Sequence, residues 1–227
     1  RALASGRSMT IAAVVPTLDS AIFSRTMQAM QVALANEGYQ LLVASHEYSA
    51  AAEADAVRTL LSRGVDGIML VGAERHATTR ELLASVGTPV VLTWCNLPEF
   101  HCVSIDSHRA DRLAAEYLIG LGHRRIGVVI GRTEFNDRQK ARLSGIMAAL
   151  KAAEVDLPDW LVTRQPMTLA GGRSGCATLL ELQEPPTAII GGIDLLAIGC
   201  IAELHARDIH VPRSMSIVGI DDLEMSA

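Results

Sequence analysis

Short apolar runs alternate with amphipathic stretches along most of the chain. Runs of this kind are typical of strands that are buried on both faces of a parallel sheet. They lie at residues 10–15, 40–44, 67–70, 89–93, 126–130, 187–190 and 216–220. The repetition of strand followed by helix predicts parallel sheets joined by right-handed crossovers, and therefore an α/β fold.

The stretches between the runs predict amphipathic helices. The clearest covers residues 108–121, where apolar side chains recur at the spacing of one helix face. Its expected stripe consists of Ala110, Leu113, Ala114, Tyr117, Leu118 and Leu121. A second helix is expected at 137–150, with a stripe of Leu143, Ile146, Met147 and Leu150. Because Arg142 falls off that stripe, we expect its removal to leave the stability of the unliganded chain nearly unchanged.

The alternation breaks at residues 94–107, WCNLPEFHCVSIDS. Two strand-like pieces, 89–93 and 102–105, are separated there by a loop and not by a helix, which suggests that the chain leaves one sheet and enters another. We therefore place a boundary near residue 107, between an amino-terminal lobe at 9–107 and a carboxyl-terminal lobe at 108–227. The expected architecture is two doubly wound parallel-sheet lobes with a ligand crevice between them.

Composition narrows the class of protein. A hydrophobic fraction of 49% with 20% charged residues is close to the globular average and argues against disorder. The formal net charge of −5 disfavours direct binding of nucleic acid by this chain, because such binding depends on cationic contacts to phosphate. The four cysteines show neither CxxC spacing nor a histidine at zinc-ligand spacing, so we expect free thiols and no metal or cofactor.

Compartment signals are few. No apolar run reaches the length of a membrane span, and the first residues lack the apolar core of a signal peptide. We therefore expect a cytoplasmic protein with no membrane partner, although a mature exported protein would also have lost its signal.

Candidate site residues follow the predicted strands, because ligands of open parallel sheets bind outside the carboxyl ends of the strands. The candidates are Asp19, Ser20, Phe23, Trp94, Asp106, Arg142, Ile193 and Asp221. Taken singly, an Asp or Ser at a strand–helix junction is most often a helix cap, so it is the convergence of the set that indicates a site. Asp221 and Asp222 are adjacent, and neighbouring side chains of an extended chain point to opposite faces, so at most one of them is expected to face a ligand.

Enzyme signatures are missing from the sequence. No GxGxxG follows the first strand and no GxxxxGK[ST] occurs. GGRSGC at 171–176 approaches a nucleophile elbow, but its glycine spacing is wrong and no predicted strand precedes it. His123 is expected in a turn at the amino end of the sheet. We therefore expect a protein that is not an enzyme.

Several motifs in a fixed order carry a resemblance to a known family. They are LGHRRIGVVIG (121–131), ARLSGIMAAL (141–150), DLLAIGC (194–200) and SIVGIDD (216–222), preceded by GYQLLVAS (38–45) and LLSRGVDGIMLV (60–71). The chain resembles the effector-binding region of the LacI/GalR family of bacterial transcription regulators over nearly its whole length. The resemblance implies a bilobed fold of the periplasmic-binding-protein type I.

The resemblance also implies a function and partners. The lobes would close around a small-molecule effector, a sugar or sugar acid, and so alter operator affinity. RALASGRS (1–8) resembles the end of a hinge that leads to a helix-turn-helix domain absent here, and relatives continue beyond GIDD, so the carboxyl-terminal lobe is expected to be truncated. Operator DNA would be bound only through the absent domain, and two-fold operators imply a homodimer. The alternative is a periplasmic sugar-binding protein of a transport system. A third interpretation, a sugar-metabolising α/β enzyme, is opposed by the missing enzyme signatures.

Residue roles follow from the same resemblance. Asp221 would accept hydrogen bonds from ligand hydroxyls while Asp222 serves the turn, and Arg142 would be the main donor. Asp19, Ser20 and Phe23 match a pocket loop, and Trp94 would stack on a sugar face. Ile193 stands where relatives usually have Asn, and Ala21-Ile22 replace a Pro-aromatic pair. We therefore expect a fully hydroxylated pyranose to be disfavoured relative to a ligand that is apolar near Ile193, or to a sugar acid held by Arg142.

Overall fold

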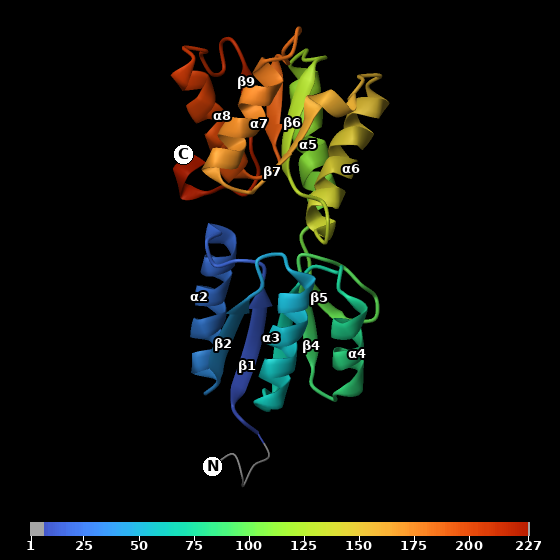
Figure 1. Cartoon of the computed structure of the whole chain (residues 1–227), viewed down its shortest axis with the longest axis vertical. Helices are drawn as coiled ribbons and strands as arrows, with labels where there is room; N and C mark the ends of the chain where they lie inside the picture. The colour runs from blue at the N-terminus through green and yellow to red at the C-terminus, as the bar shows by residue number, and fades with distance from the viewer. Residues whose placement is uncertain (1–6, 227) are drawn as a thin grey trace. The chain divides into compact units, whose positions relative to one another are not determined.

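The computed structural model describes residues 7–226 and divides into two compact units (Figure 1). The first lobe consists of Arg1–Ile105 with Phe135–Asp137, and the second lobe of Asp106–Glu134 with Arg138–Ala227. Most of the expected hinge remnant, residues 1–6, lies outside the described residues.

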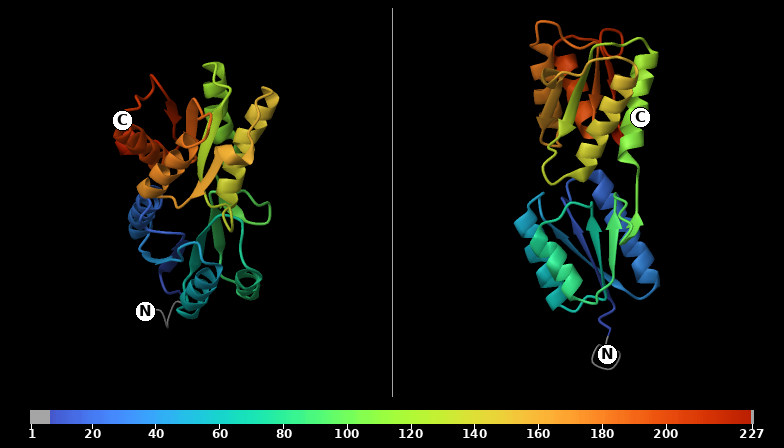
Figure 2. Two further views of the ribbon diagram at one scale, coloured as in Figure 1. Left: turned by 45° about the horizontal axis from the view of Figure 1, so that its top comes forward. Right: turned by 90° about the vertical axis from the view of Figure 1, so that its right-hand side faces the viewer.

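A five-stranded parallel sheet in the order β2-β1-β3-β4-β5 forms the centre of the first lobe. Its strands are β1 (Thr10–Val15), β2 (Gln40–Ser45), β3 (Gly67–Val71), β4 (Val90–Thr93) and β5 (His101–Val103), and its helices are α2 (Ala21–Asn36), α3 (Ala50–Ser62) and α4 (Ala77–Ser85). Helices lie on both faces of the sheet (Figure 2). Alternate residues of β1 show this: Ala12 and Val14 pack with α3 and α4, whereas Ala13 and Val15 pack with α2.

The second lobe repeats this plan with a four-stranded parallel sheet in the order β7-β6-β8-β9. Its strands are β6 (Ile126–Gly131), β7 (Val162–Gln165), β8 (Ala188–Gly191) and β9 (Ser216–Val218). Its helices are α5 (Ser107–Gly120), α6 (Asp137–Ala152), α7 (Leu169–Leu180) and α8 (Asp194–Ala206), with short 3₁₀ turns at Asp159–Leu161 and Glu224–Ser226. The helices α5 and α6 pack on the face of β6 that carries Val128, and α7 and α8 on the face that carries Val129. The predicted α/β fold with two doubly wound parallel sheets is confirmed.

Two predicted details of the strands are wrong. Residues 101–103 do not enter a second sheet, because β5 pairs in parallel with β4 at the edge of the first one. GGRSGC does have a strand before it, since β7 precedes α7 and the motif lies inside that helix. Its glycines serve packing: a Cβ on Gly172 would collide with the backbone oxygen of Leu196 in α8.

The apolar faces that the sequence predicts for α5 and α6 agree only partly with the buried faces of these helices. The buried residues of α5 are Ser107, Asp111, Ala114, Ala115 and Leu118. Leu113, Tyr117 and Leu121, which the sequence places on the buried stripe, are 53%, 63% and 58% exposed. In α6, Arg142 is buried together with Ile146 and Leu150, whereas Met147 is exposed. The true buried faces are therefore rotated from the predicted ones and include charged residues.

Other expectations concern thiols, membranes and metals. All four cysteines are free, with Cys95, Cys176 and Cys200 buried and Cys102 half-buried. Between residues 7 and 226, no helix has both the length and the apolar character needed to cross a bilayer, and no three His, Cys, Asp or Glu side chains are grouped so that they could hold a metal ion.

Candidate functional site

The topology of each sheet places the candidate residues. The strand order reverses between β1 and β3 in the first lobe and between β6 and β8 in the second. Ligands of open α/β sheets bind outside the carboxyl ends of the strands at such a reversal. The candidates fall into two groups, one at this edge of each lobe, and we describe each group within its own lobe.

In the first lobe, Asp19 and Ser20 occupy the loop between β1 and α2. Ser20 is the N-cap residue of α2, yet its side chain makes no capping hydrogen bond to the helix. The side chain of Asp19 is exposed, and its backbone N–H donates to Thr17 Oγ1 over 3.2 Å. Neither side chain caps α2 through a hydrogen bond, and ligand contact by Asp19 and Ser20 stays a prediction.

An aromatic pair lies close to this loop. Phe23 in α2 is buried, and its ring centroid lies 5.2 Å from that of Trp94, with an interplanar angle of 80°. Trp94 directly follows β4 and has a φ of 57°, in the left-handed region that bulky residues rarely adopt. Such backbone strain is concentrated at functional sites. The half-buried indole of Trp94, held edge-to-face by Phe23, suits stacking on an apolar ligand face.

Two candidates of the second lobe have structural roles of their own. Asp106 is exposed and caps α5, since its Oδ1 accepts a hydrogen bond from the backbone N–H of Arg109 over 2.9 Å. Ile193 is the N-cap residue of α8, and its partly buried side chain packs against the apolar cluster that includes Val129 and Leu196. Ligand contact by these two residues stays a prediction.

The main feature of the second lobe is a buried charged triad. Arg142 in α6 donates from Nη1 to Asp111 Oδ2 over 3.1 Å and from Nη2 to Asp221 Oδ1 over 3.4 Å. The side chains of Arg142, Asp111 and Asp221 are only 11%, 0% and 6% exposed. The structure thus brings together two residues that the sequence predicts for the site and adds a third, Asp111, that it does not.

A close approach of two helices positions the triad. A Cβ on Gly145 would collide with the backbone oxygen of His108, so only glycine allows α6 to come this near to the first turn of α5. Arg142 lies about one helical turn before Gly145, and Asp111 about one turn after His108. The glycine of the ARLSG motif therefore sets the distance at which the guanidinium meets the carboxylate.

Asp221 and Asp222 face different surroundings, but they lie in a turn after β9 and not in the extended chain that the sequence-based prediction assumed. Asp222 is exposed with a φ of 52°, whereas Asp221, with a φ of 135°, turns its carboxylate to Arg142. Asp194 supports this turn: its Oδ2 accepts hydrogen bonds from Leu223 N over 2.8 Å and from Ser226 Oγ over 2.7 Å. A Cβ on Gly219 would collide with Asp194 Oδ1, so the glycine leaves room for this carboxylate.

Burial dominates the electrostatics of the triad. Desolvation raises the pKa of Asp111 to about 7, although Arg142 acts in the opposite direction through its charge and hydrogen bond. Desolvation likewise raises the pKa of Asp221 to about 6, with Arg142 lowering it and the carboxylate of Asp194 raising it further. Within residues 7–226, Asp111 Oδ1 and Arg142 Nε are buried and have no hydrogen-bond partner. A shifted pKa together with unsatisfied polar atoms is typical of a binding site.

His123 lies at the opposite end of the second sheet. Its Nδ1 is 2.8 Å from Thr187 Oγ1, just before β8, and its Nε2 is 3.0 Å from Ser216 Oγ, the first residue of β9. It thus ties the amino ends of two strands together, as expected for a turn residue away from the ligand edge.

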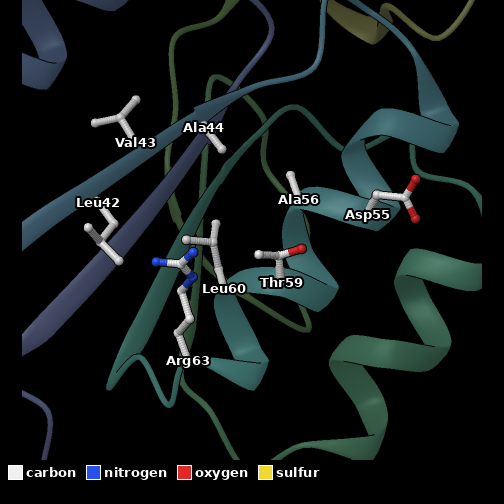
Figure 3. A pocket seen from close by; sticks show the side chains of 8 residues that line it. All are labelled: Leu42, Val43, Ala44, Asp55, Ala56, Thr59, Leu60 and Arg63. Carbon is white, nitrogen blue, oxygen red and sulfur yellow. The ribbon is translucent and has the colours of Figure 1, made fainter.

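A groove in the first lobe is separate from the candidate residues. It has a volume of about 360 Å³ and lies between the edge strand β2 and helix α3 (Figure 3). Its lining consists of Leu42, Val43, Ala44, Asp55, Ala56, Thr59, Leu60 and Arg63. Since its polar residues, Asp55, Thr59 and Arg63, are all exposed, the groove has no buried polar group to orient a ligand.

Comparison with known proteins assigns the chain to a family. Residues 8–226 match the family described as periplasmic binding proteins and sugar binding domain of LacI family. The chain is 30% identical over 226 residues to the HTH-type transcriptional regulator GntR of Pseudomonas aeruginosa, covering 98% of this chain and 65% of that protein. The chain thus spans slightly less than two thirds of that relative.

Solved structures give the same result. The transcription regulator GntR from Chromobacterium violaceum has a TM-score of 0.88 at 27% identity, covering 95% of this chain and 79% of that one. A LacI family transcriptional regulator from Lactobacillus casei with bound glucose has a TM-score of 0.85 at 25% identity, covering 95% and 82%. With the family match across nearly all described residues, these likenesses show that the chain belongs to the LacI family, as its periplasmic-binding-protein-like effector-binding domain.

Proposed function

We propose that this domain senses a small hydroxyl-bearing metabolite, a sugar or a sugar acid, for a cytoplasmic transcription regulator. Residues of both lobes contribute ligand contacts, with Arg142 and Asp221 in the second lobe and Ser20 and Trp94 in the first. The observation that carries the proposal is the buried Arg142–Asp221 pair, with a contact of 3.4 Å, at the carboxyl ends of the strands. It offers a donor and an acceptor in the arrangement that a ligand hydroxyl needs.

The proposed mechanism is a change in the population of two states. A ligand that binds the closed arrangement of the lobes more tightly than the open one shifts the population toward the closed state. Because binding free energies are reciprocally linked, that shift changes operator affinity in DNA-binding heads outside this chain. Two-fold operators need paired heads, so the working unit is a homodimer. The relatives that the chain resembles are transcription regulators, which favours this role over transport.

A ligand screen tests the proposal. The chain is melted in the presence of neutral sugars, sugar acids and nucleobases, and hits are measured by calorimetry. A ligand at 100 times its Kd should stabilise the fold by about 2.7 kcal/mol. Arg142→Ala should abolish the effect, whereas Arg213→Ala, which removes an exposed arginine before β9, should retain it. A hit that survives Arg142→Ala unchanged would place the ligand elsewhere.

A further inference from the structure

The guanidinium of Arg142 is occupied by this chain's own carboxylates before any ligand arrives. Its two terminal nitrogens contact Asp111 at 3.1 Å and Asp221 at 3.4 Å. Asp194 contributes a third carboxylate, whose charge acts on Asp221. The site therefore contains more negative than positive charge, in a region where the side chain of Asp111 is inaccessible to water.

We propose that Asp111 is a specificity-determining residue that makes the second lobe accept an uncharged hydroxyl group of the ligand and reject a carboxylate. The inference rests on the proposed function, because it specifies the ligand chemistry of the same Arg142 site. It also narrows the choice that the sequence leaves between a neutral sugar and a sugar acid.

The chemistry of the guanidinium supports this choice. A ligand carboxylate normally binds arginine through two parallel N–H···O bonds. At Arg142 it would be a further anion beside Asp111 and Asp221, and repulsion between like charges is strong where water is excluded. A hydroxyl group brings no charge into the site. It can also donate a hydrogen bond to Asp221 and accept one from a guanidinium N–H at the same time. Arg142 Nε, buried and without a partner among the described residues, is such a donor.

Asp111 is fixed where it is, so a ligand cannot easily displace it. It lies in the second turn of α5, on the buried face shared with Ala114, Ala115 and Leu118. The close approach of Gly145 to His108, about one helical turn from the ion pair, holds α6 against the first turn of α5. Asp221, in contrast, lies in the turn after β9, where successive φ angles of 135° and 52° mark irregular backbone. Asp111 is thus the permanent partner of Arg142, and Asp221 the one that shares its oxygens with a ligand.

Matched sugar pairs test the inference. Glucose with glucuronate, and galactose with galacturonate, differ only in the carboxylate at carbon 6. Calorimetry at pH 8 on the whole chain should give a neutral member that binds about tenfold or more tightly than its acid. Asp111→Asn should reduce that ratio by about tenfold, because it removes one anion at nearly constant shape. Glu116→Gln, which removes an exposed carboxylate from the same helix, should leave the ratio unchanged.

The possible outcomes separate the two proposals. A wild-type preference for the acid, or a ratio that Asp111→Asn leaves unchanged, overturns the role of Asp111 and leaves the proposed function intact. Failure of the wild-type chain to bind any carbohydrate overturns the proposed function and this inference with it.

A measurement on the wild-type chain decides the matter if Asp111→Asn does not fold. The charged groups acting on the two carboxylates are Arg142 from α6, Asp194 from α8, and Asp111 and Asp221 themselves. A uronate stays ionised at pH 5, whereas Asp111 and Asp221 take up protons between pH 8 and pH 5. The preference for the neutral sugar should therefore shrink at pH 5, and a ratio that is the same at both pH values contradicts the inference.

Discussion

The two lobes share one fold but differ in the chemistry at the carboxyl ends of their strands. The first lobe presents exposed Asp19, half-buried Ser20 and the Phe23–Trp94 pair. The second lobe presents the triad of Arg142, Asp111 and Asp221, with side chains at most 11% exposed. Similar sheets can thus carry either an aromatic surface or a buried charge cluster, because the loops after the strands and the helix faces differ.

Among residues 7–226, each lobe buries one arginine, Arg75 in the first and Arg142 in the second. In the first lobe, Arg75 donates to the carbonyl oxygen of Gly72 over 2.7 Å and lies 3.8 Å from one carboxylate, that of Glu53. In the second lobe, Arg142 meets two carboxylates, and one of its nitrogens has no partner in the described part of the chain. Arg75 thus bonds to its own loop after β3, whereas Arg142 bridges two buried carboxylates that come from α5 and from the turn after β9. We therefore expect the largest effects on ligand affinity in the second lobe.

Removing Arg142 is the strongest test of this comparison. Arg142→Ala leaves two buried carboxylates without their cation, which should cost about 3–5 kcal/mol of unfolding free energy in addition to abolishing ligand binding. The burial of Arg142 thus replaces the expectation, drawn from its place off the predicted stripe, that the unliganded chain would be unaffected. Urea unfolding at pH 8 measures the loss, with Arg213→Ala as the control. A loss below about 1 kcal/mol would show that the triad is not a buried charge cluster.

The pH dependence of stability is the next largest effect. Burial raises the pKa of Asp111 from 3.8 to about 7, so the folded state holds more protons than the unfolded state between these pH values. This contribution to stability is present below about pH 4 and is lost as pH rises through about 7. The unfolding free energy of the wild type should therefore fall relative to that of Asp111→Asn by about 1–3 kcal/mol between pH 5 and pH 8. A constant difference across this range would mean that Asp111 is not desolvated.

The two adjacent aspartates give a comparison within the second lobe. Asp221→Asn keeps the side-chain shape but removes the charge, and should weaken a hydroxyl-bearing ligand by about 1.5–3 kcal/mol. Asp222→Asn should have a much smaller effect, since Asp222 is exposed in the turn. Calorimetry with the best carbohydrate of the screen measures both. Equal losses at the two positions would contradict the assignment of Asp221 as the ligand acceptor.

The sequence predicts the fold better than the site because the two depend on different signals. Strands buried on both faces appear as apolar runs, and β1 and β6 begin at the residues expected. The strand missed, β7, is at the edge of its sheet and reads VTRQ, with only Thr163 buried. An edge strand needs no continuous apolar run, so periodicity does not reveal it.

The sequence does not identify Asp111 as a site residue, also because its signal is not a run of large apolar side chains. Asp111 is in phase with Ala114, Ala115 and Leu118 on α5, so the stripe of small apolar residues was the signal that could have indicated its burial. The larger side chains of Leu113 and Tyr117 indicate a different buried face of α5, but both side chains are exposed. Small residues face the neighbouring helix because α5 and α6 approach closely at Gly145, a tertiary contact that no local pattern specifies.

The smallest effect is expected in the first lobe, at Trp94. Stacking of an aromatic ring contributes about 0.5–1.5 kcal/mol beyond area burial, so Trp94→Ala should weaken carbohydrate binding by roughly three- to tenfold, and Trp94→Phe by less. The chain has two tryptophans, and Trp160 in the second lobe is 63% exposed, so Trp160→Ala is the matched control and should leave affinity unchanged. In a Trp160→Phe background, the fluorescence of Trp94 reports contact of the ligand with the first lobe directly. If Trp94→Ala weakens binding more than Asp221→Asn does, the Phe23–Trp94 pair contributes more to ligand affinity than the charged triad. The first lobe, and not the second, would then make the larger contribution to binding.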